Sequence, residues 1–101
     1  MEQVSFVRLR AELGNYLDRS HYQGETFLVT RHNTPIVLLS PAPSEQDIEA
    51  GTFETTSAAE ARKNLSEHLS RVHFQAVNLL VQKHRKTIAL FRKFDNQGQG
   101  C

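Results

Sequence analysis

An internal repeat constrains this chain more than any other feature, because a duplicated segment is expected to fold twice in the same way. When the 101-residue sequence is shifted by 52 positions, residues 4–40 align without gaps with residues 56–92. Of the 37 aligned pairs, twelve are identical, among them Arg10 with Arg62. The chain is therefore expected to contain two copies of one structural unit.

Each copy begins with a short extended segment and continues as an amphipathic helix. Mostly apolar residues recur at helical spacing at positions 9, 13, 16, 17 and 20, and again at positions 61, 65, 68, 69 and 72. Ser5 precedes the first helix and Ser57 the second, and a serine oxygen can accept from the unpaired amides of a first helical turn. In the second copy, Glu60 follows Ser57 by three residues, which predicts a capping box.

The rest of each copy is typical of a β-hairpin. Residues 26–31 and 36–40 in the first copy, and residues 78–83 and 87–92 in the second, are rich in β-branched, leucine and phenylalanine side chains. Short polar links join them, but neither link contains the glycine that tight hairpins usually carry. Arg85 tolerates a positive φ less well than Asn33, so the second turn is left open.

The repeat divides the chain into a first unit at residues 1–41, a linker at 42–54, a second unit at 55–94 and a tail at 95–101. The linker contains proline, glycine and acidic residues, with one helical turn expected from Ser44. A strand, a helix and a hairpin cannot bury their apolar faces alone, whereas two such units packed sheet to sheet can. The expected fold class is α+β.

Composition places the chain among ordinary soluble proteins, with 39% hydrophobic and 23% charged residues. Its single cysteine, Cys101, cannot form an internal disulfide, and no stretch approaches the roughly 20 apolar residues that span a bilayer. The N-terminus has neither the basic region nor the apolar run of a signal peptide. A cytoplasmic location without membrane contact is expected.

Two stretches resemble the DNA-binding domain of Phd/YefM antitoxins. That family follows the pattern Ser-x-x-Glu-Ala-Arg-x-Asn-Leu, then a helix, then a strand ending Thr-Arg-x-Gly-x-Pro and a last apolar strand. The second copy matches the first half of the pattern and the first copy matches the second half: Ser57-Ala58-Ala59-Glu60-Ala61-Arg62-Lys63-Asn64-Leu65 and Val29-Thr30-Arg31-His32-Asn33-Thr34-Pro35-Ile36-Val37-Leu38-Leu39.

The resemblance implies a fold and a function. Members of the family are homodimers, so two β-α-β-β repeats in one chain imply a single-chain pseudo-dimer with a shared antiparallel sheet core. The resemblance also implies a sequence-specific DNA-binding transcriptional regulator, an antitoxin-like repressor that reads two operator half-sites in double-stranded DNA. Further pairing into a homodimer of pseudo-dimers stays open.

The family's DNA contacts fall on the arginine after Glu-Ala and on the basic residue that ends the second strand. Carried over by position, these are Arg10, Arg31, Arg62 and Lys83. Arg8, Lys63, Arg85 and Lys86 extend the predicted DNA-binding set. Arg85 and Lys86 belong, with Lys83, to the densest basic cluster of the chain. The alternative for Arg10 and Arg62 is a surface ion pair with a local carboxylate, and for the cluster it is a solvated turn.

Charge is distributed unequally between the two copies. Residues 2–41 carry four basic and four acidic side chains, whereas residues 55–95 carry eight basic and three acidic ones. Because phosphate neutralisation depends on local charge, this asymmetry predicts an imperfect or asymmetric operator.

The other candidate chemistries have less support. The five histidines lack cysteine partners at ligand spacing, which argues against a zinc site, and no cofactor is expected. No phosphate loop, nucleophile elbow or paired carboxylates appear, which argues against an enzyme. His21 and His73 are expected near helix ends, and Tyr22 and Phe74 in the core or an interface.

The alternative function is a protein-interaction module that binds and neutralises a toxin or another partner protein. Family antitoxins use a C-terminal helix for this task, but nothing amphipathic follows Phe94. Toxin binding would then require the linker or a sheet edge.

Overall fold

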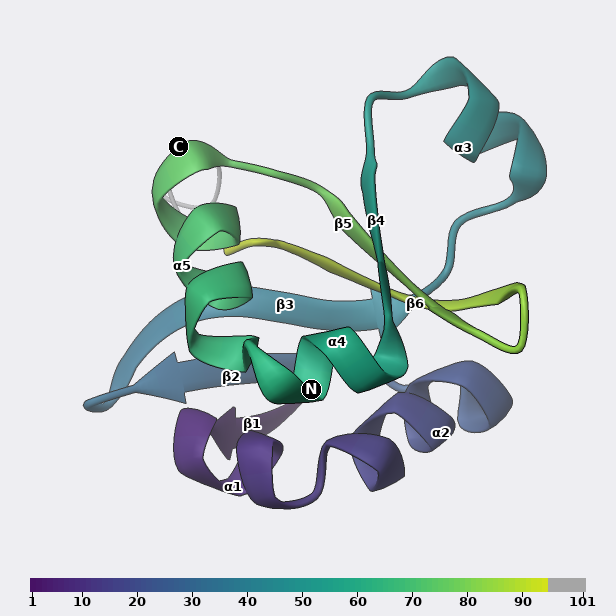
Figure 1. The fold of residues 1–101 in the computed structure, drawn as a ribbon. Helices are drawn as coiled ribbons and strands as arrows, with labels where there is room; N and C mark the ends of the chain where they lie inside the picture. The colour runs from purple at the N-terminus through teal and green to yellow at the C-terminus, as the bar shows by residue number, and fades with distance from the viewer. Residues whose placement is uncertain (95–101) are drawn as a thin grey trace.

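The computed structural model describes residues 1–94, which form one six-stranded sheet and five helices, an α+β fold (Figure 1). The predicted tail, residues 95–101, lies outside the described part. In chain order the elements are β1 (Glu2–Ser5), α1 (Phe6–Ala11), α2 (Leu13–Gln23), β2 (Phe27–Arg31), β3 (Thr34–Pro41), α3 (Glu45–Ala50), β4 (Glu54–Ser57), α4 (Ala58–Lys63), α5 (Leu65–Gln75), β5 (Leu79–Lys83) and β6 (Lys86–Lys93).

The sheet has the strand order β1-β2-β3-β6-β5-β4, so the two repeats join edge to edge. The expectation of two units packed sheet to sheet is therefore wrong. The four central strands are antiparallel, as expected, but β1 pairs with β2 and β4 pairs with β5 in parallel, which makes the sheet mixed. The parallel pairs arise because a helical crossover returns the chain in the same direction.

The seam between the repeats is the pairing of β3 with β6. Leu39 lies opposite Phe91, which is the residue 52 positions further along the chain, and Leu38 lies opposite Arg92 just as Ser40 lies opposite Leu90. Exchanging the two repeats therefore maps this register onto itself. The sheet has a pseudo-twofold axis that passes between Leu39 and Phe91.

Both hairpins turn through two residues with positive φ. The φ angles are 53° and 63° at His32 and Asn33, and 52° and 64° at His84 and Arg85. Two positive φ values in a two-residue loop are typical of a type I′ turn, whose twist matches that of paired strands. The second turn, left open by the sequence, thus forms like the first without glycine.

The amphipathic helix of each repeat is broken into two. Ser5 Oγ accepts from the Arg8 amide at 3.2 Å and Ser57 Oγ from the Glu60 amide at 3.0 Å, which confirms both N-caps. The backbone then leaves helical geometry at residues 12 and 64, where φ is −127° and −123°. The reciprocal part of the capping box is wrong, because the Glu60 carboxylate accepts from the Asn64 side chain instead.

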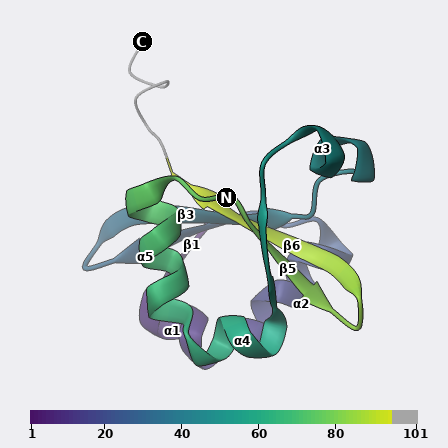
Figure 2. The ribbon, with the colours of Figure 1, turned by 45° about the horizontal axis from the view of Figure 1, so that its top comes forward.

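Helices α1, α2, α4 and α5 cover one face of the sheet, whereas α3 lies away from them (Figure 2). Core side chains such as Phe27, Val29 and Phe91 point toward these helices. Both α2 and α5 pack on β3 and β6, so each repeat's long helix helps to cover the other repeat's strands. The two halves share one core.

The link between the repeats contains the short helix expected there. Ser44 Oγ accepts from the Asp47 amide at 3.2 Å and caps α3, none of whose residues is buried. The link carries the chain from the central strand β3 to the edge strand β4. None of the helices in residues 1–94 has the length and apolar character needed to cross a membrane.

Candidate nucleic-acid interface

The basic residues of the helix-covered side divide into those that have a carboxylate partner and those that do not. Arg19 donates to Glu2 at 2.9 Å and its repeat-related residue Arg71 donates to Glu54, repeat-related to Glu2, at 2.6 Å. This duplicated pair ties α2 to β1 and α5 to β4. Its repetition therefore has a structural cause.

Arg10 and Arg62 are also a repeated pair, but neither has a carboxylate within ion-pair distance in residues 1–94. Both side chains are exposed, and each lies two residues before the break that ends its helix. Neither arginine therefore forms the local ion pair that was the alternative to DNA contact. The same freedom from acidic partners applies, among the described residues, to Arg31, Lys63, Lys83, Arg85 and Lys86.

Arg10 of the first repeat and Lys63 of the second line the same shallow hollow. Asn64, Leu65 and Ser66, where α4 passes into α5, form its other side. The helix breaks thus have a geometric role, because they bring the basic ends of α1 and α4 to a common surface. Glu67 is the single acidic side chain that lines this hollow.

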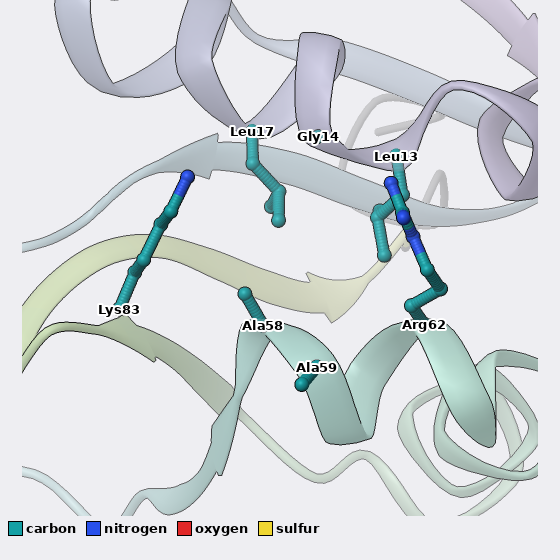
Figure 3. A pocket seen from close by; sticks show the side chains of 7 residues that line it. All are labelled: Leu13, Gly14, Leu17, Ala58, Ala59, Arg62 and Lys83. Carbon is teal, nitrogen blue, oxygen red and sulfur yellow. The ribbon is translucent and has the colours of Figure 1, made fainter.

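Arg62 and Lys83 line a second hollow, between α2 of the first repeat and α4 of the second (Figure 3). Its volume is about 300 Å³, and its floor consists of small and aliphatic side chains. Arg62 and Lys83 rise on opposite sides of this floor. The hollow shares α4 with that of Arg10 and Lys63, so the two lie next to each other.

Arg31 occupies the position that corresponds to Lys83 in the other half. Its guanidinium lies 4.6 Å from the centre of the Phe6 ring and donates to Ser66 Oγ at 3.4 Å. Ser66 also lines the hollow of Arg10 and Lys63. These contacts connect five basic side chains from both repeats, which we call the basic helix surface: Arg10, Arg31, Arg62, Lys63 and Lys83.

The remaining predicted residues lie at the margins of this surface. Arg8 is 68% exposed and pairs with Glu12 at 3.5 Å, one turn away on the same chain segment. Lys86 lines a hollow with Lys83, where the β5–β6 hairpin tip approaches the end of α2, and Arg85 occupies the turn itself. A DNA role stays a prediction for these three residues, as it does for the five residues of the basic helix surface.

The ion pairs of Arg19 with Glu25 and Glu2 shift the pKa values of two groups. Hydrogen bonds that Arg19 donates to Glu25, and then to Glu2, raise the pKa of Arg19 above its ordinary value. The same hydrogen bond from Arg19 lowers the pKa of the Glu25 carboxyl. Both groups stay charged at neutral pH, so they fix the position of α2 without contributing a free cation.

Of the two expectations for Tyr22 and Phe74, the core is wrong and an interface stays a prediction. Tyr22 and Phe74 are each 78% exposed at the C-terminal ends of α2 and α5, so neither belongs to the core. Their neighbours His21 and His73 are near the helix ends as expected, and His73 Nδ1 lies 3.2 Å from the Ile36 carbonyl oxygen of the other repeat. Within residues 1–94, no three potential metal ligands of the His, Cys, Asp and Glu types cluster together.

Sequence reasoning missed the small residues that open the hollow in Figure 3. The repeat alignment places Ala58 opposite Phe6, and Gly14 opposite Ser66. A large residue aligned with a small one in the two copies was the signal that could have indicated this hollow. Comparison with known proteins finds no matching family model, no similar curated protein and no similar solved structure.

Proposed function

We propose that this protein is a sequence-specific DNA-binding transcriptional regulator that contacts a duplex through the basic helix surface. In this proposal the chain is a single-chain pseudo-dimer of the Phd/YefM type, and each repeat reads one half-site of an operator. The observation that carries it is the contrast between the two repeated arginine pairs. Arg19 and Arg71 are bound to carboxylates, whereas Arg10 is exposed beside Lys63 of the other repeat and Arg62 is exposed beside Lys83 of its own repeat.

Charge chemistry supports this choice of ligand. Cations without acidic partners repel one another, and a polyanion that neutralises them also releases its own counterions. Arginine side chains can hold phosphate oxygens or reach the edge of a guanine, so the same groups serve positioning and base recognition. A twofold arrangement of such groups suits a duplex with two related half-sites.

Fluorescence anisotropy tests the proposal, with a duplex that the wild-type protein has selected from a randomised pool. We expect Arg10→Gln and Arg62→Gln each to weaken binding by about 1–3 kcal/mol, with a shallower salt dependence. The matched control is Arg92→Gln, because Arg92 follows the core residue Phe91 in β6 and so lies on the sheet face without helices.

Two results would overturn the proposal. One is a pool from which no duplex is enriched at low salt. The other is a loss of affinity in the Arg92 variant as large as that in the Arg10 and Arg62 variants, which would show that only total charge matters.

A protein-interaction role is the second candidate, and the exposure of Tyr22 and Phe74 favours it. Aromatic side chains are enriched at the centres of protein interfaces. Co-expression with the product of the neighbouring gene, followed by size-exclusion chromatography, tests this role. Co-elution that is lost in a Tyr22→Ala, Phe74→Ala double variant would support it, and separate elution with wild type would contradict it.

A further inference from the structure

The tip of the β5–β6 hairpin approaches the C-terminal end of α2, and a hollow of about 360 Å³ lies between them (Figure 1). A space of this size is within the range of small-molecule sites. Six titratable side chains from both repeats line it: Asp18, His21, Tyr22, Lys83, His84 and Lys86. This density of basic and aromatic groups raises the question of what the hollow binds.

Two lysines stand side by side at this hairpin tip. Lys83 lies opposite Lys86 in the register of β5 and β6, so both side chains leave the same face of the hairpin. Neither has a carboxylate within ion-pair distance among residues 1–94. Like charges directly opposite each other on paired strands destabilise the pairing. An anion that contacts both ammonium groups would relieve this repulsion.

A second hollow occupies the repeat-related place, between α5 and the β2–β3 hairpin, but its lining differs. Thr34 stands opposite Arg31 there, so the hairpin has no pair of like charges. Arg31 lies 4.6 Å from the centre of the Phe6 ring, and His73 Nδ1 lies 3.2 Å from the Ile36 carbonyl oxygen. Two basic groups of the second hollow already have partners, so an anion gains less there.

Tyr22 and Asp18 add features that a bare anion does not need. The Tyr22 ring is 78% exposed and lies edge-on to His21, with the ring centroids 4.5 Å apart. Nucleic-acid bases stack on exposed aromatic rings of this kind. The Asp18 carboxylate forms no ion pair within residues 1–94. It would repel a bare phosphate, but it can accept hydrogen bonds from the hydroxyl groups of a sugar.

We propose that the hollow at the end of α2 binds a ribonucleoside 5′-monophosphate. The phosphate contacts Lys83 and Lys86 and accepts a hydrogen bond from His84. The ribose hydroxyls donate to Asp18, and the base stacks on Tyr22. The inference goes beyond the proposed function and does not depend on it, because binding of a free nucleotide requires no duplex.

Isothermal titration calorimetry with AMP, GMP, CMP and UMP tests the proposal. We expect at least one of them to bind about tenfold or more tightly than inorganic phosphate and than its own nucleoside, because each of these lacks half of the contacts. In an amide NMR titration, that nucleotide should shift the signals of Tyr22 and Lys86. The signal of Phe74, at the repeat-related hollow, should stay in place.

Variants that copy the repeat-related residues identify the groups responsible. Lys86→Thr copies Thr34 and should weaken nucleotide binding about tenfold, the effect of one lost charge-assisted hydrogen bond. Tyr22→Ala should weaken it about fivefold or more, whereas Tyr22→Phe, which copies Phe74, should bind like wild type. The matched control is Arg92→Gln, which removes one positive charge from the sheet face without helices and should leave the affinity unchanged.

Three results would overturn the inference. If no nucleotide binds more tightly than inorganic phosphate, the hollow attracts an adventitious ion only. If Lys86→Thr and Arg92→Gln weaken binding equally, only the total charge matters. If Tyr22→Ala binds like wild type, the base does not stack in this hollow. None of these results bears on the proposed function, which the duplex selection tests separately.

Discussion

The two repeats share one scaffold but differ in what they add to it. In the first repeat, the Tyr16 ring packs edge-on against Phe27 at 5.1 Å, and Arg19 binds two carboxylates. The second repeat has His68 in place of Tyr16, and Arg71 there binds only Glu54. It carries the excess positive charge instead. The comparison teaches that the first repeat has the better-paired side chains in its core, whereas the second repeat carries most of the net positive charge.

The largest expected effect concerns the seam that joins the halves. Phe91 and Leu39 face each other across the pseudo-twofold axis, and both are fully buried. We expect Phe91→Ala to lower the free energy of unfolding by about 3–5 kcal/mol and Leu39→Ala by about 2–5 kcal/mol. Urea unfolding measures both. A larger loss for Leu39→Ala would show that the seam does not depend on the larger side chain.

Substitutions at the repeat-related positions 16 and 68 test the difference in core packing between the two repeats. Tyr16→His should lower the free energy of unfolding by about 2 kcal/mol, because the aromatic pair is lost and polar nitrogens are buried. Both ring nitrogens of His68 are buried without a hydrogen-bond partner, so His68→Leu should raise it by about 1 kcal/mol. If chemical denaturation shows that His68→Leu destabilises, the second core is better satisfied than its geometry indicates.

A smaller effect is expected at the ends of α2 and α5. Gly24 and Ala76 occupy equivalent left-handed positions, with φ of 69° and 54°. Because alanine is strained there and glycine is not, Ala76→Gly should stabilise the fold by about 1 kcal/mol. Gly24→Ala should cost a similar amount. A Cβ atom at Gly24 has no neighbour within 4 Å, so any loss reports backbone strain alone. Thermal unfolding of the pair decides this.

The smallest effect is expected for acid sensitivity. The pKa of Glu25 is lowered in the folded protein from its ordinary value of 4.5, so its contribution to stability is present above that pH. It is lost as the pH falls through the folded pKa. Glu25→Gln should therefore lower stability at neutral pH and flatten the decline in acid. An unchanged curve of unfolding midpoint against pH would show that Arg19 gains nothing from its second carboxylate.

Local signals predicted much of the fold and less of the site. Ser5 and Ser57 marked the helix starts because capping depends on neighbouring residues. The breaks at residues 12 and 64 were missed because the apolar periodicity continues across them, and the positive φ of Arg85 is imposed by the paired strands. The core alternative for Tyr22 and Phe74 was wrong because an aromatic side chain near a helix end says little about what covers it.

The parallel pairing of β1 with β2 and of β4 with β5 could not be predicted, because it depends on the direction in which the helical crossover returns the chain to the sheet. All five residues of the basic helix surface were named from the sequence, four of them by their position in the family pattern, and their role in DNA binding stays a prediction. Their freedom from acidic partners could be seen only once Arg19 and Arg71 were located on Glu2 and Glu54. The same residue type in the same repeated pattern has two different surroundings.

The pairing of β3 with β6 inside one polypeptide also affects how such a protein can change over generations. In an association of identical subunits, every substitution appears on both sides of the axis, so a change that helps one side is imposed on the other. Here a mutation alters one side only. Position 58 can therefore carry an alanine while the repeat-related position 6 carries a phenylalanine, a difference that two identical subunits could not have.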